Sequence, residues 1–247
     1  MKDPGGIIDV WMQHPTINTR SNNMNKFAIF TISVMLLLAV QAEALESVKL
    51  PAPEITGGMA VNQAIHTRRS VRSYREAPIS LRDMGQLLWS AQGITDPKTG
   101  HRAAPSAVAT YPLQLYAVVK EGGVTGLPAG VYLYEPKNHG LAVVKKGNFY
   151  PDLVAAMSFF NSWVKKSDVV FIFTGSSTLI QKLSKESGIL YTDLEAGMAA
   201  ENLLLESVSL GLGRCTIGGF KSEKITGLLG IDKDLRVLLI VSIGQTE

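Results

Sequence analysis

Residues 191–220, YTDLEAGMAAENLLLESVSLGLGRCTIGGF, organise the rest of the chain. The first two-thirds of this segment carries apolar and small residues at helical spacing, and a helix that is apolar on more than one face is normally buried. Gly211 stops the helix, and residues 214–217 are predicted to form a strand that ends at Gly218 and Gly219. A glycine pair leaves backbone N–H groups uncovered. The segment therefore predicts a buried central helix, a strand and a turn suited to a flat ligand.

Small residues occupy one section of this predicted helix. They are Ala196, Gly197, Ala199 and Ala200. Side chains of this size leave little bulk on the helix surface, so we expect another backbone to approach the helix closely at this section.

The composition indicates one globular domain. The chain has 247 residues, of which 46% are hydrophobic and 18% are charged, and these proportions suit a full core. A net charge of +3 is too small to indicate a nucleic-acid partner. The only cysteine, Cys215, has no histidine near it in the sequence, and we interpret it as a small core residue. The four histidines lack the spacing of metal ligands, so no metal site is predicted.

The first 44 residues are predicted to lie outside the fold. Residues 27–42, FAIFTISVMLLLAVQA, are apolar, Lys26 precedes them, and residues 42–44 read Ala-Glu-Ala. This is the layout of a secretory signal, and the run is shorter than the about 20 residues of a spanning helix. We expect residues 1–44 to be an N-terminal extension and signal peptide, and residues 45–247 to be exported to the periplasm or beyond. An uncleaved anchor is the alternative; after cleavage no stable membrane span is expected.

The remaining chain predicts strands and helices without strict βαβ alternation. Ser80 and Asp83 form a capping box that begins a helix, which Gly93 ends. Further helices are expected at residues 59–66, 152–157 and 221–229, in a helical region from 178, and from 189 onward; strands are expected at residues 113–119, 131–134, 141–145, 169–174, 214–217 and 235–243. This order of elements indicates an α+β fold.

Three arginines and a serine form the first candidate binding segment. Arg68, Arg69, Ser70 and Arg72 lie within five residues, just after a short predicted helix. Guanidinium groups hold phosphate oxygens in pairs, and a hydroxyl adds a neutral donor. The segment therefore predicts an anion pocket, with a solvated basic turn as the alternative.

Two further segments are rich in small residues. Residues 102–110, RAAPSAVAT, combine a proline that restrains the chain with small residues that let a ligand approach the backbone. Gly218 and Gly219 can present N–H donors to the edge of a ring. The alternatives are a loop entering a strand and a tight turn.

In order and spacing, these segments resemble the nitroreductase-like flavoprotein superfamily, and within it the SagB-type dehydrogenase branch. The resemblance covers about residues 63–244. It rests on five motifs, which are RRSVRSY (68–74), LLWSAQGIT (87–95), RAAPSAVATYPLQLYAV (102–118), LEAGMAAENLLLESVSLGLGRCTIGGF (194–220) and LLGIDKDLRVLLIVSIG (228–244).

The resemblance implies a nitroreductase-like α+β fold with a central, mainly antiparallel sheet flanked by helices. It also implies a homodimer around the long buried helix, with two FMN sites at the interface. The resemblance implies that the FMN phosphate is held by Arg68, Ser70 and Arg72, with Arg69 close by. The face of the flavin ring would be lined by Pro105, Ser106 and Ala107 of the partner subunit, and the ring edge would meet Ile217, Gly218 and Gly219. Arg102 would lie at the polar edge of the flavin.

The activity implied by this resemblance is that of an FMN-dependent oxidoreductase. It would pass two electrons from a hydride donor, with NADH or NADPH as candidates, to a small organic acceptor by a ping-pong mechanism. The flavin carries the chemistry, so no catalytic side chain is expected. One alternative is a non-catalytic flavin-binding dimer, because the chain ends without the basic residues that complete the phosphate site in many members. The other is an azoline dehydrogenase acting on a modified peptide, although Leu190 precedes Tyr191 where that branch has lysine.

Overall fold

The computed structural model describes residues 46–176, 178, 185–232 and 234–247. The chain divides into two units, Met1–Ala44 and Leu45–Glu247, and every described helix and strand belongs to the second unit. The expected N-terminal extension and signal peptide lie outside the described residues, as does most of the helical region expected from residue 178. No helix in the described part of the chain is both long enough and apolar enough to cross a membrane.

A seven-stranded sheet forms the centre of the domain. Its strands are β1 (Ser47–Lys49), β5 (Leu113–Val119), β7 (Gly130–Glu135), β8 (Gly140–Lys146), β9 (Val169–Gly175), β10 (Leu212–Ile217) and β11 (Arg236–Gln245). Their order is β1-β8-β7-β5-β9-β11-β10, and every neighbouring pair is antiparallel. The predicted α+β fold with a mainly antiparallel sheet is confirmed.

Two pairs of short strands lie outside this sheet. β2 (Ile79–Ser80) runs parallel to β6 (Val124–Thr125), and β3 (Ile94–Asp96) runs antiparallel to β4 (His101–Arg102). None of these four strands was expected from the sequence, because each is too short to show a periodic pattern.

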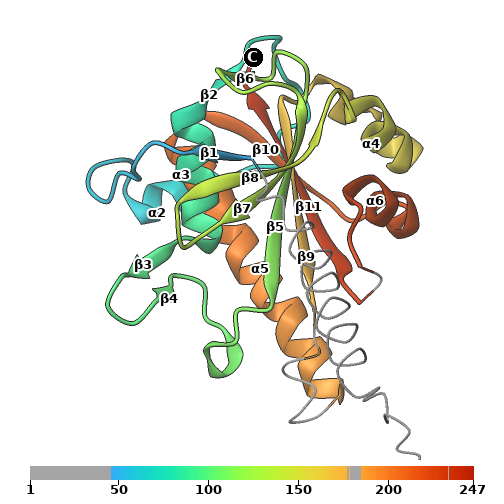
Figure 1. The fold of residues 1–247 in the computed structure, drawn as a ribbon. Coiled ribbons are helices and arrows are strands. Elements are labelled where there is room, and N and C mark those ends of the chain that lie inside the picture. The colour runs from blue at the N-terminus through green and yellow to red at the C-terminus, as the bar shows by residue number, and fades with distance from the viewer. Residues whose placement is uncertain (1–45, 177, 179–184, 233) are drawn as a thin grey trace, which may run out of the picture. The chain divides into compact units, whose positions relative to one another are not determined.

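Helices cover both faces of the sheet (Figure 1). They are α2 (Val61–Thr67), α3 (Leu81–Gln92), α4 (Tyr150–Ala156), α5 (Lys185–Ser209) and α6 (Ser222–Leu229), with short 3-10 helices η1 (Ala107–Ala109) and η2 (Phe159–Lys166). α3 and α5 pack on one face, and α4 and α6 pack on the other. The expected capping box begins α3, where the Asp83 N–H donates to Ser80 Oγ at 3.0 Å.

The two faces bury alternate residues of the central strands. Along β5, Leu115 and Ala117 join the apolar cluster under α3 and α5, whereas Tyr116 and Val118 join the cluster under α4 and α6. Successive side chains of a strand point to opposite faces. A strand with helices on both sides is therefore apolar at most positions, and along β5 the polar Gln114 is the exception and is only partly buried.

Within one chain, α5 is buried on one face only. Ala196, Ala199 and Ala200 are buried against the chain's own sheet. At these three small residues the helix therefore packs against the chain's own sheet. Gly197 lies on the exposed face, where an added Cβ would meet open space.

The outer face of α5 carries a row of large apolar side chains. Leu190, Tyr191, Leu194 and Met198 are between 39% and 55% exposed. Leu194 follows Leu190 by four residues and Tyr191 by three, and Met198 follows Leu194 by four, which places them on one side of a helix. This row, called the outer stripe below, is the second apolar face that the sequence predicted, and it is partly exposed to solvent.

Candidate functional site

The segment after α2 is tied to β10 and β11, the last two strands in the order of the sheet. The Val71 N–H donates to the Arg214 carbonyl at 2.8 Å, and the Arg75 N–H donates to the Gln245 carbonyl at 3.1 Å. The buried Tyr74 hydroxyl bonds both the Val71 carbonyl, at 3.1 Å, and Ser242 Oγ, at 2.9 Å. These bonds fix where the basic residues of this segment lie.

Three of the four expected phosphate-binding residues gather around one position on β10. Cys215 is buried, as predicted for a core residue. Burial raises the pKa of its thiol, while Arg72, Ser70 and Arg68 oppose that rise. Residues two apart in an extended segment point to the same side. Arg72, Ser70 and Arg68 thus all act on the Cys215 thiol, two of them through their charge and Ser70 through a hydrogen bond.

Arg69 points elsewhere. Its Nη1 donates to the carbonyls of His66 at 3.0 Å and Arg68 at 2.7 Å. Arg68 forms a long ion pair with Glu201 of α5, in which Nε and Oε1 are 3.7 Å apart. Arg68, Ser70 and Arg72 are called the basic cluster below.

Trp163 of η2 borders the basic cluster. The Arg72 guanidinium carbon lies 5.8 Å from the centroid of the Trp163 ring, and the Tyr74 ring lies 6.2 Å from the same ring. Sequence reasoning missed both the helix and this residue. A tryptophan in a segment with little periodicity was the one available signal.

The glycine pair follows directly on β10. Ile217 is buried, and the Gly219 carbonyl accepts from the Ser158 N–H at 2.9 Å and from Asn161 Nδ2 at 3.0 Å. A Cβ on Gly219 would lie 2.9 Å from Ser158 Oγ, whereas a Cβ on Gly218 would meet open space. Gly219 thus packs against η2, and Gly218 leaves a bare stretch of backbone. The basic cluster and the glycine pair are joined by one strand.

Pro105, Ser106 and Ala107 belong to a different part of the chain. They follow β4, in a loop at the same end of Figure 1 as β3 and β4. Here the Tyr111 N–H donates to Ser106 Oγ at 2.8 Å. The structure therefore does not place these residues on β10 of their own chain.

Arg102 is turned into its own chain. Its Nη1 donates to Gln92 Oε1, its backbone N–H donates to the Tyr111 hydroxyl at 3.2 Å, and its guanidinium carbon lies 4.5 Å from the Tyr111 ring centroid. Burial lowers its pKa, and Glu195 of α5 opposes that change. The sequence pattern carried no sign of these partners.

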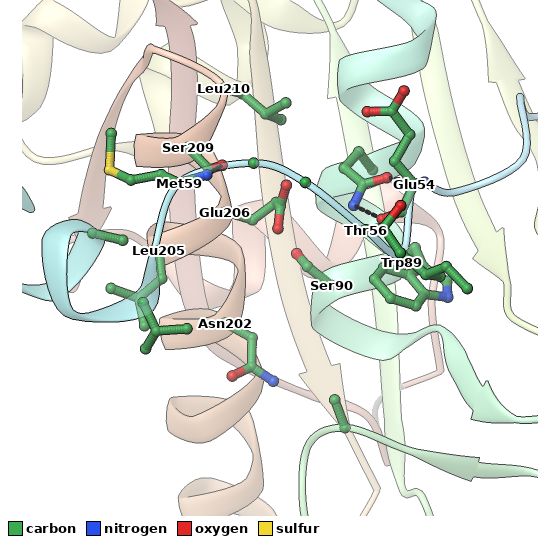
Figure 2. A pocket seen from close by; sticks show the side chains of 17 residues that line it. Glu54, Thr56, Met59, Trp89, Ser90, Asn202, Leu205, Glu206, Ser209 and Leu210 are labelled. Atoms are coloured by element: carbon green, nitrogen blue, oxygen red, sulfur yellow. Dashed lines mark hydrogen bonds between the residues drawn. The ribbon is translucent and has the colours of Figure 1, made fainter.

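A cavity of about 560 Å³ lies between residues 54–59, α3 and α5. None of the eleven expected cofactor-binding residues lines it. Figure 2 shows Glu206 and Asn202 reaching toward it from α5, and Ser90 from α3. Its charged lining residues are Glu54 and Glu206 alone. A cavity bordered by carboxylates disfavours a phosphate group, so we do not assign a nucleotide to it.

In the described part of the chain, no group of three or more His, Cys, Asp or Glu side chains is placed to hold a metal ion.

Comparison with known proteins identifies the family. The model of the Nitroreductase family matches residues 65–245. A Methanocaldococcus jannaschii protein named "Putative nitroreductase MJ1384" is 30% identical over 200 residues, which cover 81% of this chain and 98% of that protein.

Solved structures share the fold. A crystal structure described as a "putative nitroreductase" from Ralstonia eutropha JMP134 is 25% identical, with a TM-score of 0.70 over 81% of this chain and 90% of that one. The NADPH:FMN oxidoreductase from Vibrio harveyi, complexed with NAD+, is 16% identical, with a TM-score of 0.55 over 76% of this chain and 69% of that one. Because the family model spans most of the sequence and the archaeal relative aligns along nearly its whole length, the chain belongs to the nitroreductase family.

Proposed function

We propose that the protein is a homodimeric FMN-dependent oxidoreductase. The observation that carries the proposal is that the segment bearing the basic cluster bonds to β10 through the Val71 N–H, and that the bare backbone of Gly218 follows the same strand, in a nitroreductase-family chain. Anion donors at one end and uncovered backbone at the other suit a ligand with a phosphate and a flat ring. Membership of the SagB-type branch remains a prediction from the motifs.

The basic cluster fits the phosphate of FMN. Arg68 and Arg72 supply two guanidinium groups, and Ser70 supplies a hydroxyl, all beside Cys215. Charged hydrogen bonds from such groups to phosphate oxygens are among the stronger ones in proteins. Arg69 is expected to contribute less to phosphate binding, since its guanidinium already donates hydrogen bonds to two backbone carbonyls.

The end of β10 fits the flavin ring. Ile217 anchors the strand in the core, Gly219 is held against η2, and Gly218 leaves its backbone open. Bound FMN would supply the acceptance and release of hydride. The chain would bind the phosphate, orient the ring through backbone N–H groups and stabilise negative charge on the reduced ring through these donors.

A second copy of the chain is the proposed partner. The outer stripe of α5 is accompanied by exposed Val61 and Ile65 of α2, at 67% and 58%. Large apolar side chains gathered on the surface mark interaction sites. In the proposed dimer, Pro105, Ser106 and Ala107 of the partner subunit line the flavin held by the basic cluster, and Arg102 supports them from its own chain.

The electron donor and the location are proposed on separate grounds. The Vibrio harveyi protein that shares the fold is named for NADPH and FMN and was solved with NAD+, which supports NADH or NADPH as the donor. Residues 1–44 have the layout of a secretory signal, which supports export with removal of this segment. The acceptor is a small organic molecule such as a nitroaromatic or a quinone.

The purified protein spanning residues 45–247 tests this function. We expect it to retain FMN through gel filtration, to be reduced anaerobically by NADH or NADPH, and to be reoxidised by a nitroaromatic or quinone with parallel double-reciprocal plots. A protein that takes up no FMN would refute the proposal. FMN that binds but is reduced by neither nucleotide would favour the non-catalytic dimer, and turnover of an azoline-containing peptide alone would favour the azoline dehydrogenase.

A further inference from the structure

Three side chains place unpartnered polar atoms in the core beneath residues 103–111. Glu195 is 1% exposed and Gln92 is 2% exposed. Both carboxylate oxygens of Glu195, Nε2 of Gln92 and Nε of Arg102 have no hydrogen-bond partner among the described residues. Buried polar groups are nearly always hydrogen-bonded, and exceptions call for an explanation. We call these three residues the buried polar cluster.

The buried polar cluster joins three elements to the loop. Arg102 of β4 bonds Gln92 of α3. Burial raises the pKa of Glu195 on α5, and the neighbouring Ser106 hydroxyl and Arg102 guanidinium oppose that rise. Ser106 is thus close enough to favour the charged carboxylate without making a hydrogen bond of ordinary geometry to it. Helix α5 and the loop of residues 103–111 therefore meet at Glu195.

The loop above the cluster has an unusual backbone. Val108, Ala109 and Tyr111 have φ values of 54°, 51° and 46°. Side-chain-bearing residues rarely adopt this left-handed region, and a β-branched residue is a clear outlier there. Strain of this kind persists only where the surroundings hold it, and it concentrates at functional sites.

Local bonds alone close the loop without attaching it to the domain. The Tyr111 N–H donates to Ser106 Oγ at 2.8 Å, and Thr110 Oγ1 donates to the Ala107 carbonyl at 2.9 Å. The loop is attached to the domain at Tyr111, whose hydroxyl accepts from the Arg102 N–H and whose ring faces the Arg102 guanidinium. At the tip, Val108 is 79% exposed. The loop is thus anchored at one end and projects outward at the other.

We propose that Glu195 is a positioning residue that acts with Arg102 to hold residues 103–111 in the conformation that lines the flavin of the other subunit. The inference rests on the proposed function, because it requires the shared FMN site. It assigns a role to Glu195 of α5 that requires no contact between this side chain and the flavin or the substrate.

The first test compares two carboxylates of α5 under the same substitution. Glu195→Gln replaces the carboxyl group beside Arg102 and Ser106 with an amide, and we expect FMN to bind on the order of tenfold more weakly by fluorescence titration. Glu206→Gln is the matched control, because burial also raises the pKa of Glu206 but its neighbour is Gln86 rather than the loop. Equal FMN affinity in Glu195→Gln and the wild-type protein would overturn the proposal.

The second test locates the effect in the opposite subunit. Arg68→Ala chains and Glu195→Gln chains are co-expressed with different tags, and the mixed dimer is purified. One of its two sites combines both defects, whereas the other combines a normal basic cluster with a normal loop. We expect one FMN per mixed dimer to bind with wild-type affinity. No recovered site would show that Glu195 acts within its own subunit, contrary to the proposal.

A third measurement is independent of FMN. Amide hydrogen exchange in the Glu195→Gln protein is expected to rise in residues 103–111 and to stay unchanged in β5. Unchanged exchange in the loop would contradict the positioning role. If Glu195→Gln fails to fold, Ser106→Ala removes the loop side of the same contact, and the same exchange and mixed-dimer results are expected of it. A wild-type protein that binds no FMN would refute the proposed function alone, since the exchange result would still stand.

Discussion

Arginine residues next to one another in the sequence have different tasks in the fold. Arg68→Ala and Arg72→Ala should each weaken FMN binding by about 1.5–3 kcal/mol, if each makes a charged hydrogen bond to the phosphate. Arg69→Ala is the control and should have the smaller effect, because its guanidinium already donates to the carbonyls of His66 and Arg68. Fluorescence titration of the purified proteins measures all three. An Arg69→Ala effect as large as the other two would contradict the assignment.

The two adjacent glycines separate stability from ligand binding. Gly219→Ala places a Cβ 2.9 Å from Ser158 Oγ, and overpacking of this kind destabilises a protein by about 1–3 kcal/mol. Gly218→Ala points its Cβ into open space, where we propose that the flavin ring lies. We therefore expect Gly219→Ala to lower Tm, and Gly218→Ala to keep Tm while weakening FMN binding. A Gly218→Ala protein with unchanged FMN affinity would exclude the ring from this position.

At the scale of elements, α5 serves its own chain with one face and, as proposed, a second chain with the other. Leu194→Lys puts a charge in the middle of the outer stripe, where Leu194 is 52% exposed. We expect the variant to remain folded, to run as a monomer in light scattering after gel filtration, and to lose FMN. Glu223→Lys, on the exposed face of α6, is the control and should remain a dimer. A Leu194→Lys dimer with full FMN content would place the interface elsewhere.

Local sequence patterns predict those elements whose cause is local. β5 and β9 are apolar at most positions because helices cover both faces, and α3 begins at a serine that bonds the Asp83 N–H. η2 has no such pattern, since it is held by bonds from Ser158 and Asn161 to Gly219, about sixty residues away. β1 was missed because it is an edge strand of three residues that pairs only with β8.

The candidate site is predictable only in part for the same reason. The motif around Arg68 indicates phosphate binding, but its place beside Cys215 depends on a pairing with a strand far along the chain. No local pattern distinguishes Glu195, which is buried, from Glu201, which is exposed on the same helix. Burial set by long-range packing is therefore the part that required the structure.

The stability of the whole domain should depend on a carboxyl group outside the site. Asp168 is buried, and burial raises its pKa to about 6, against a bond from the Gln245 N–H and the charge of Lys120. Because the folded pKa exceeds the unfolded value of 3.8, the folded state binds more protons between these values, and stability falls as pH rises through this window. At pH 7.5 the effect is on the order of 3 kcal/mol.

Asp168→Asn tests this dependence, because the amide oxygen can still accept from the Gln245 N–H. We expect the variant to have a higher Tm than the wild-type protein at pH 7.5, with the difference shrinking toward pH 4. Calorimetry across this range measures it. A wild-type Tm that stays above that of the variant at neutral pH would show that the charged carboxylate stabilises the fold.

The hydrogen bond from Val71 to β10 has a consequence for the protein's resistance to aggregation. β10 ends the sheet, and an uncovered terminal strand invites pairing with strands of other molecules, which leads to aggregation. The segment that carries the basic cluster occupies that open edge through the Val71 and Arg214 backbones. The segment proposed to bind the phosphate thus also covers the edge strand of the sheet. A substitution that detaches this segment would lower the solubility of the protein as well as its affinity for the cofactor.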